Sequence, residues 1–228
     1  MYRFSSLLDN QNKRLFLASL LACLMISGLA IAVQEHFPFD DDFYGKLRQR
    51  YGERAERPVK AWQSLIEEQQ QNDIMAQLNA SNYFANRRIR YATDKEHWQQ
   101  NDYWATPIES LVSQRGDCED YAILKYATLR ALGVPEEKLR LMYVRASTVN
   151  EPHMVLIYFE TPQSLPLVLD NLTDKILPAD QRPDLRPVYS FNGQGLWLAR
   201  AQGLGKPVKN SSGVSSWTRL LERIEQGE

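Results

Sequence analysis

The sequence predicts an α+β fold in which helices come first and an antiparallel sheet follows. Between residues 59 and 132 the apolar residues recur at the spacing of amphipathic helices. From residue 141 to residue 198 they form short runs separated by turn residues, which is typical of strands. Because the helices and the strands are grouped along the chain, we expect the two kinds of element to form separate layers around one core.

The helical part is expected to contain four helices. Two of them cover Val59–Gln71 and Asp73–Asn86, and a short third helix runs from Pro107 to Val112. The strongest helix extends from Cys118 to Leu132, because it is apolar over more than one face and Gly133 follows it. A helix of this kind usually lies at the centre of a domain.

The second part of the chain contains the expected strands and one more helix. Asn192–Gly195 is expected to be a hairpin turn, and Ser215–Glu225 a short C-terminal helix. Near the other end, Phe37–Asp42 is expected to be an exposed connector. Strands are expected over Leu141–Arg145, Met154–Glu160, Leu165–Asp170, Tyr189–Phe191 and Leu196–Leu198.

An uncharged apolar run from Leu15 to Val33 follows two basic residues near the N-terminus. Together with the small residues Ala30–Ala32, this order is typical of a secretory signal that is cleaved after Ala32. The run also approaches the length of a membrane span, so an uncleaved anchor is the alternative. We therefore expect residues 1–32 to be a signal peptide or membrane anchor, and residues 33–228 to be a single domain outside the cytoplasm.

Charge and cysteine content narrow the function. The net charge is −1 and no strong basic run occurs, so the footprint of a nucleic-acid-binding protein is absent. Only two cysteines occur, and Cys23 lies in the apolar segment. If that segment is removed, Cys118 has no intramolecular disulfide partner. An unpaired cysteine in an exported protein is a liability unless it is buried or used.

Cys118 begins the strongest helix directly after a glycine-containing turn. A helix N-terminus stabilises negative charge, so a thiol there ionises more readily. Backbone N–H groups at the same helix end, including that of Cys118, can bind an oxyanion. This setting suits a nucleophile, but it also suits a buried structural cysteine, which is the more common fate of a single cysteine.

His153 is the histidine best placed to act as a base. It opens the most apolar strand, whereas His36 lies beside the apolar N-terminal segment and His97 lies in a polar stretch. Asp170 ends the next strand, and antiparallel pairing would bring it to the same sheet edge, where it could orient the imidazole. The alternatives are a structural edge histidine and an aspartate that begins a turn.

Six segments carry a resemblance to a known family: Arg115–Ala122, Leu132–Pro135, His153–Leu156, Leu169–Leu172, and upstream Tyr91–Asp94 and Asp102–Pro107. They resemble the bacterial transglutaminase-like cysteine proteinases, and among these the LapG-type periplasmic proteases. The resemblance covers most of residues 45–200, and the cysteine-containing motif is specific. The order of cysteine, histidine and aspartate is that of the transglutaminase and papain-like group.

The resemblance implies a papain-like or transglutaminase-like core, in which the helix of the nucleophile packs on the antiparallel sheet. It also implies a cysteine endopeptidase with Cys118 as nucleophile, His153 as base and Asp170 as the orienting group. The family's substrate is a large cell-surface adhesin, which is cut near its N-terminus in the periplasm, so that the adhesin is released and the biofilm disperses. An inner-membrane cyclic-di-GMP receptor of the LapD type sequesters the protease and holds back its activity.

Three acidic residues flank Cys118 and, taken alone, disfavour its thiolate. Asp117, Glu119 and Asp120 can be explained as a helix cap and a solvated first turn, where acidic residues are favourable. The resemblance implies calcium dependence instead, with Asp117 and Glu119 matching the family's calcium ligands and Asp120 as a weaker candidate. Calcium takes about six to eight oxygen ligands, so others must come from elsewhere in the chain.

Two other functions are compatible with the same residues. The acyl-enzyme could pass its acyl group to an amine, as transglutaminases do, or an exported binding module could keep the fold without the activity. Trp104 and Gln114 are further candidates for the wall of the site or for hydrogen-bond donation, although packing and surface roles explain them equally well.

Overall fold

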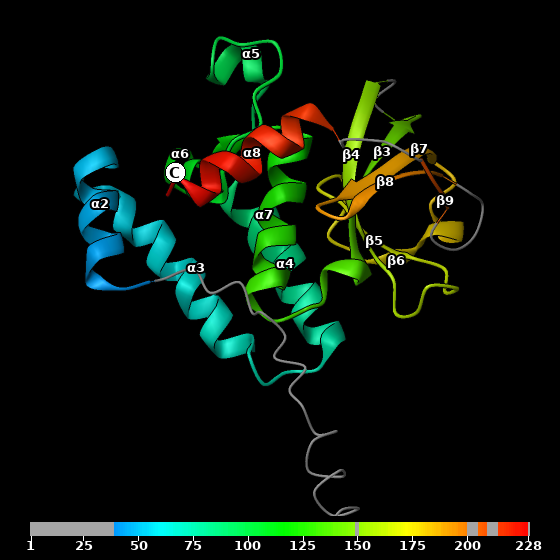
Figure 1. Ribbon diagram of the computed structural model, residues 1–228, viewed down its shortest axis with the longest axis horizontal. Coiled ribbons are helices and arrows are strands. Elements are labelled where there is room, and N and C mark those ends of the chain that lie inside the picture. The colour runs from blue at the N-terminus through cyan, green and yellow to red at the C-terminus, as the bar shows by residue number, and fades with distance from the viewer. Residues whose placement is uncertain (1–38, 149–150, 200–204, 209–213, 228) are drawn as a thin grey trace, which may run out of the picture. The chain divides into compact units, whose positions relative to one another are not determined.

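A seven-stranded antiparallel sheet packs against a layer of helices in this computed structural model (Figure 1). The structure describes residues 39–148, 151–199, 205–208 and 214–227, which belong to one compact unit beginning at Gln34. The expected signal peptide or anchor, residues 1–32, lies outside the described residues. Within the described ranges, no helix combines the length and the hydropathy that a membrane span requires. The expected α+β class is confirmed.

Each helix expected from the sequence is present, with its ends shifted by at most three residues. The short helix α5 and the N-terminal helix α2 are additions to that set. The helices are α2 (Asp41–Tyr51), α3 (Glu56–Gln69), α4 (Ile74–Arg88), α5 (Asp94–His97), α6 (Pro107–Ser113), α7 (Cys118–Ala131) and α8 (Ser215–Glu225).

Helix α2 corrects part of the expectation that Phe37–Asp42 is an exposed connector: Asp40–Asp42 are exposed but form the start of the helix, and Phe37 and Pro38 lie outside the described residues. Asp40 caps the helix, because its side chain accepts a hydrogen bond from the Phe43 N–H at 2.8 Å. The acidic residues that follow occupy the first helical turn, where the helix dipole favours negative charge. Tyr44 and Leu47 bury the inner face of the helix. The acidic run is therefore a helix start, not a solvated linker.

The strands of the large sheet follow the order β6-β5-β4-β3-β7-β8-β9. The hairpin expected at Asn192–Gly195 is confirmed, since Asn192 pairs with Gly195 across the turn. Strand β4 begins at Glu151. His153 therefore lies inside this strand, whereas the sequence suggested that His153 opens it. The strands are β3 (Leu139–Ala146), β4 (Glu151–Tyr158), β5 (Leu167–Leu169), β6 (Leu177–Pro178), β7 (Leu185–Asn192), β8 (Gly195–Leu198) and β9 (Lys206–Pro207).

Helix α7 occupies the centre of the fold. It contacts α3, α4 and α6 as well as the strands β3 and β4, which explains why its apolar residues cover more than one face. A buried hydrogen bond joins it to α3, where Trp62 Nε1 donates to Thr128 Oγ1 at 2.8 Å. Because α7 is held on several sides, its N-terminus has a fixed position relative to the sheet.

The central position of α7 leads to a prediction for stability. Leu124 is fully buried on this helix, so Leu124→Ala should lower the free energy of unfolding by about 2–5 kcal/mol. Denaturant unfolding followed by circular dichroism measures the change. The matched control is Leu198→Ala, because this leucine is 52 % exposed and its truncation should change stability by less than about 0.5 kcal/mol. Equal losses in both variants would contradict a core centred on α7.

Candidate active site

A short parallel pairing fixes the turn that precedes α7. The strand β1 (Arg90–Tyr91) pairs with β2 (Arg115–Gly116), so a segment far upstream holds the turn in place. Glycine is required at position 116, because a methyl group on its Cα would overlap with the carboxylate of Asp120. The turn ends at Cys118, the first residue of α7.

Asp120 holds the same turn from within the protein. Its Oδ1 accepts a hydrogen bond from the Ala105 N–H at 2.9 Å, and its Oδ2 accepts one from the Asp117 N–H at 3.2 Å. The side chain is fully buried, and burial raises the pKa of Asp120, with a further contribution from the charge of Asp117. Both oxygens already bind backbone N–H groups, so Asp120 anchors the turn whether or not it also contacts a metal.

Cys118 carries a free thiol at the N-terminus of α7. Its Sγ donates a hydrogen bond to Glu119 Oε2 at 3.0 Å and accepts one from the Met154 backbone N–H on β4. Burial raises the pKa of the Cys118 thiol well above its usual value, and the carboxylates of Glu119 and Asp117 raise it further. The thiol therefore stays protonated at neutral pH.

His153 of β4 and Asp170, directly after β5, form a buried pair. The distance between His153 Nε2 and Asp170 Oδ1 is 2.7 Å, and the two residues are 4 % and 1 % exposed. Asp170 also accepts hydrogen bonds from the Leu172 N–H at 3.1 Å and from Arg182 Nη2 at 2.6 Å. Burial acts to raise the pKa of Asp170, but the hydrogen bonds and charges of His153 and Arg182 overcome it and lower this pKa to about 2.

The ionised Asp170 determines how the imidazole of His153 is used. A carboxylate can only accept hydrogen bonds, so Nε2 of His153 carries the proton that points at Asp170. Nδ1 is then the ring nitrogen that can take a proton from another group. The neighbouring residue Met154 contacts the thiol of Cys118 through its N–H, so β4 brings the imidazole and the thiol to the same region.

Of the three candidate catalytic residues, two are in direct contact in the structure. His153 and Asp170 are hydrogen-bonded, whereas the thiol of Cys118 donates to Glu119 and makes no hydrogen bond to His153 among the described residues. Catalytic hydrogen bonds in ligand-free enzymes are often long and tighten only in the substrate complex. Freeing the thiol from Glu119 is therefore a condition for its reaction with substrate.

Arg182 is a site residue that sequence reasoning missed. Its guanidinium is 6 % exposed and bridges Asp170 to Asp184, with Nη2 at 2.6 Å and 2.7 Å from the two carboxylates. On the opposite side, Asn86 of α4 donates to the Asp170 carbonyl at 3.0 Å. Both the side chain and the backbone of Asp170 are therefore held in place. No motif marks Arg182 in the sequence, because Arg182 lies in the irregular segment that follows strand β6.

A carboxylate cluster lies beside the thiol and is larger than the sequence suggested. Asp94, at the start of α5, and Asp102, in the segment that follows it, join the acidic residues of the α7 N-terminus. Oxygen atoms of Asp94, Asp117 and Asp120 lie within 4.8 Å of one another, and so do those of Asp94, Asp102 and Glu119. Asp94 and Asp102 come from a segment far upstream, so their spacing in the sequence gave no signal.

The cluster has the properties of a cation site. Oδ1 of Asp94 and Oδ1 of Asp117 are buried and have no hydrogen-bond partner among the described residues. Burial, followed by the charge of Glu119, raises the pKa of Asp117 to about 9, and burial raises the pKa of Asp94 and of Glu119 as well. Several hard oxygen donors with unpartnered buried atoms fit the preference of calcium, so these residues are suited to hold it.

Trp104 and Gln114, which the sequence offered as wall or donor residues, have separate places. Trp104 is buried and stacks on Phe191 with 5.8 Å between the ring centroids, while its Nε1 donates to Asp102 at 3.0 Å. Gln114 is exposed and ends α6 in the left-handed conformation, with φ of 54°. Trp104 therefore supports one of the acidic residues of the cluster.

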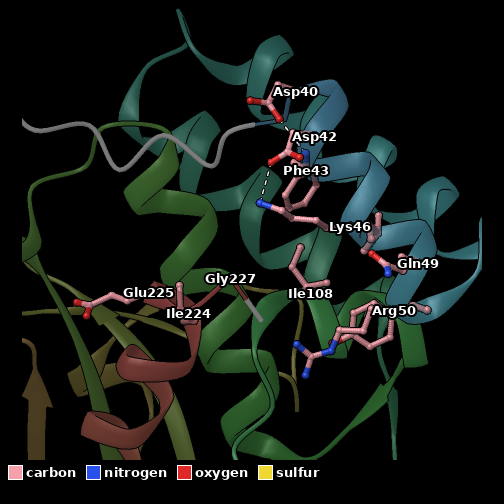
Figure 2. Close-up of a pocket in the computed structure, with 12 residues that line it drawn as sticks. Asp40, Asp42, Phe43, Lys46, Gln49, Arg50, Ile108, Ile224, Glu225 and Gly227 are labelled. Carbon is pink, nitrogen blue, oxygen red and sulfur yellow. Dashed lines mark hydrogen bonds and ion pairs between the residues drawn. The ribbon is translucent and has the colours of Figure 1, made fainter.

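A groove elsewhere on the protein is not associated with this chemistry. It has a volume of about 680 Å³ and lies between α2, α6 and α8 (Figure 2). Its charged residues include Asp42 and Lys46, which pair with each other at 2.7 Å. None of the candidate catalytic residues lines it, so the arrangement of chemical groups, not groove volume, locates the site.

The lowered pKa of Asp170 leads to a prediction for acid stability. Its pKa of about 2 lies below the unfolded value of about 4, so the ionised side chain stabilises the fold at every pH above about 4. This contribution, about 2 kcal/mol, should be lost as the pH falls from about 4 to about 2. Urea unfolding at a series of pH values measures it. Asp170→Asn cannot titrate and should show a smaller loss over that range; an identical loss would contradict the prediction.

Comparison with known proteins agrees with the chemistry of the site. The family model of the bacterial transglutaminase-like cysteine proteinases matches residues 50–185, a region that contains Cys118, His153 and Asp170. The chain belongs to this family. It is therefore a cysteine proteinase by family, and the expected transglutaminase-like core is confirmed.

Solved structures of one relative cover most of this proteinase. LapG of Legionella pneumophila is 43 % identical to it, with a TM-score of 0.69, and the match covers 80 % of this chain. It covers 98 % of the LapG chain in a calcium-bound structure and 96 % in an EGTA-treated one. No curated protein matches the chain. The resemblance found in the sequence motifs thus extends over the fold as a whole.

Proposed function

We propose that this proteinase is a calcium-dependent periplasmic endopeptidase that cleaves a large surface adhesin near its N-terminus. The observation that carries the proposal is the free thiol of Cys118 at a helix N-terminus, beside a hydrogen-bonded His153–Asp170 pair and flanked by buried carboxylates. The family supplies the reaction class, because its members are cysteine proteinases. Release of the adhesin would promote biofilm dispersal.

The proposed reaction uses three residues in turn. Nδ1 of His153 takes the proton of the Cys118 thiol, and the sulfur attacks the carbonyl carbon of the scissile bond. The backbone N–H of Cys118, at the start of α7, would donate to the oxyanion. His153 then gives its proton to the leaving amine, and water hydrolyses the acyl-enzyme. Asp170 keeps Nε2 protonated and stabilises the imidazolium in both halves of the reaction.

Calcium would be held by the acidic cluster beside the thiol. Asp117 and Glu119 are the first candidates, Asp94 and Asp102 supply further oxygens, and Asp120 is the weaker candidate because its oxygens bind backbone N–H groups. The bound ion would supply positive charge that offsets the carboxylates and draws Glu119 away from the thiol. The calcium-bound and EGTA-treated forms of LapG support a calcium role in this proteinase too.

We base the proposed location and partners on the LapG-type motifs. The apolar segment of residues 15–33 would export the protein to the periplasm, or anchor it to the inner membrane if it is not cleaved. The substrate would be a large repeat adhesin. The inhibitory partner would be an inner-membrane cyclic-di-GMP receptor of the LapD type, which sequesters the proteinase.

The test is cleavage of an N-terminal adhesin fragment by the purified full-length protein, with calcium and with chelator. We expect two fragments in calcium and loss of cleavage in EGTA, restored by added calcium. Mass spectrometry of the products separates hydrolysis, which gives two free fragments, from acyl transfer, which gives a crosslinked or aminated species. Undiminished cleavage in EGTA would remove calcium from the proposal.

The calcium site can be tested apart from activity. Asp117→Asn and Glu119→Gln should each weaken calcium binding by at least tenfold in isothermal titration calorimetry, because each removes a charged ligand. Asp180→Asn is the matched control, since this aspartate is exposed and lies outside the cluster. Wild-type affinity in both cluster variants would place the ion elsewhere.

A further inference from the structure

A second groove lies on the sheet and is partly formed by β4, the strand of His153. It has a volume of about 620 Å³, within the usual range of ligand sites, and is formed by the neighbouring strands β3, β4 and β7. Its lining includes Tyr143, Arg145, Pro152 and Arg186. We call it the arginine groove. Neither the family nor the reaction described above assigns it a role.

The two arginines of the groove lie opposite each other on neighbouring strands. Arg145 on β3 and Arg186 on β7 are register partners, so the two like charges stand directly opposite each other. Both are exposed, and neither has a hydrogen-bond or ion-pair partner among the described residues. Like charges opposed across a strand pair cost stability. An anion placed between the two guanidinium groups would remove that cost.

The arginine groove continues the sheet face on which the thiol lies. Tyr143 is opposite Met154, whose N–H contacts the thiol, and Tyr143 and Cys118 both pack against the main apolar cluster. Residues two apart on a strand share a face, so Arg145 and Pro152 extend the same surface beyond that contact. Two residues of strand span about 7 Å. The groove is therefore within reach of a peptide bound at the thiol.

The strand geometry around the groove is also specialised. The pairing of β3 with β7 shifts register after Tyr143, and the extra residue, Val188, is 39 % exposed and lines the groove. Bulges of this kind are frequent beside active sites, where they redirect side chains. Tyr143 and Tyr189 stack with 5.1 Å between ring centroids and an interplanar angle of 4°, so a stacked aromatic pair adjoins the groove at Tyr143.

We infer that the arginine groove is a substrate subsite that binds an acidic side chain about two or three residues from the cleaved bond. This rests on the proposed endopeptidase function and names a feature of its substrate. A carboxylate matches the unpaired guanidinium groups, because arginine binds carboxylates through paired hydrogen bonds. The position of the acidic residue relative to the cleaved bond follows from extended binding of the peptide. In that conformation each peptide residue advances by the same step as the strand beside it.

The experiment profiles cleavage of a proteome-derived peptide library by the full-length protein in calcium. We expect an enrichment of about tenfold for Asp or Glu at one position within four residues of the cut. Arg145→Glu/Arg186→Glu should lose this preference and favour Lys or Arg at the same position. The control, Arg54→Glu/Arg57→Glu, makes the same change of charge at exposed arginines of the helical layer and should keep the acidic preference.

A binding measurement separates failure of this inference from failure of the proposed function. Two labelled octapeptides of alternating sequence, one with Ala and Glu and one with Ala and Gln, are titrated against Cys118→Ala protein. We expect the Glu peptide to bind about tenfold more tightly, and the groove substitutions to abolish the difference. No cleavage by the wild type, with this binding intact, would overturn only the endopeptidase. Cleavage without acidic preference, or equal binding of both peptides, would overturn the subsite.

Discussion

Replacing Cys118 with alanine is expected to abolish cleavage of the adhesin fragment, with a fall in kcat on the order of 10⁴- to 10⁶-fold. The sulfur is the only atom of the proposed site that forms a covalent bond with substrate. Without it, His153 and Asp170 can orient a water molecule at best, and most of the rate enhancement is lost. Cleavage is followed by gel densitometry over hours and, for the residual rate, by mass spectrometry.

The controls for this variant are its melting temperature and its calcium binding. Cys118 is half-buried and its side chain is small, so Cys118→Ala should keep the melting temperature within a few degrees of the wild type. Calcium binding should also persist, because the cluster carboxylates are unchanged. Retained cleavage in a variant that still folds and binds calcium would remove Cys118 from the reaction and end the cysteine-protease mechanism.

The central features of the fold could be predicted because they are local in the sequence. The helix of Cys118 begins at the predicted residue, since a glycine turn precedes it and apolar residues fill its faces. The pairing of β4 with β5 followed from one short loop between two apolar runs. Because that loop sets which residues face each other, the contact between His153 and Asp170 lay within reach of sequence reasoning, although their roles remain predictions.

The features that the sequence did not indicate depend on contacts between distant segments. Arg182 reaches Asp170 because β6 and the short turn after it fold back beside β5, and no periodicity encodes that return. Asp94 and Asp102 reach the thiol's acidic neighbours through an excursion of the chain around α5. The start of α2 was missed for another reason: an acidic run can be either a solvated linker or a helix start, and only the burial of Tyr44 and Leu47 decides between them.

Asp170→Asn is expected to lower kcat by about 10³- to 10⁴-fold while leaving the substrate KM nearly unchanged. The amide cannot stabilise the imidazolium of His153, and it no longer enforces the proton on Nε2. Steady-state kinetics on the fragment measures the loss. The matched control is Asp184→Asn, which removes the other, more exposed carboxylate partner of Arg182 and leaves the contact with His153 intact. Equal losses in both variants would mean that Asp170 acts only through Arg182.

The same substitution separates catalysis from stability. Asp170→Asn leaves the buried Arg182 with Asp184 as its one carboxylate partner, which should cost up to about 3 kcal/mol in the free energy of unfolding. Adding Arg182→Met removes the buried charge that Asp184 alone would have to compensate, and should restore most of that stability, because an apolar side chain of similar length fills the site. Activity should stay low in the double variant, since the imidazole still lacks its carboxylate. If activity returned together with stability, Asp170 would have only a structural role and His153 would need no orienting group.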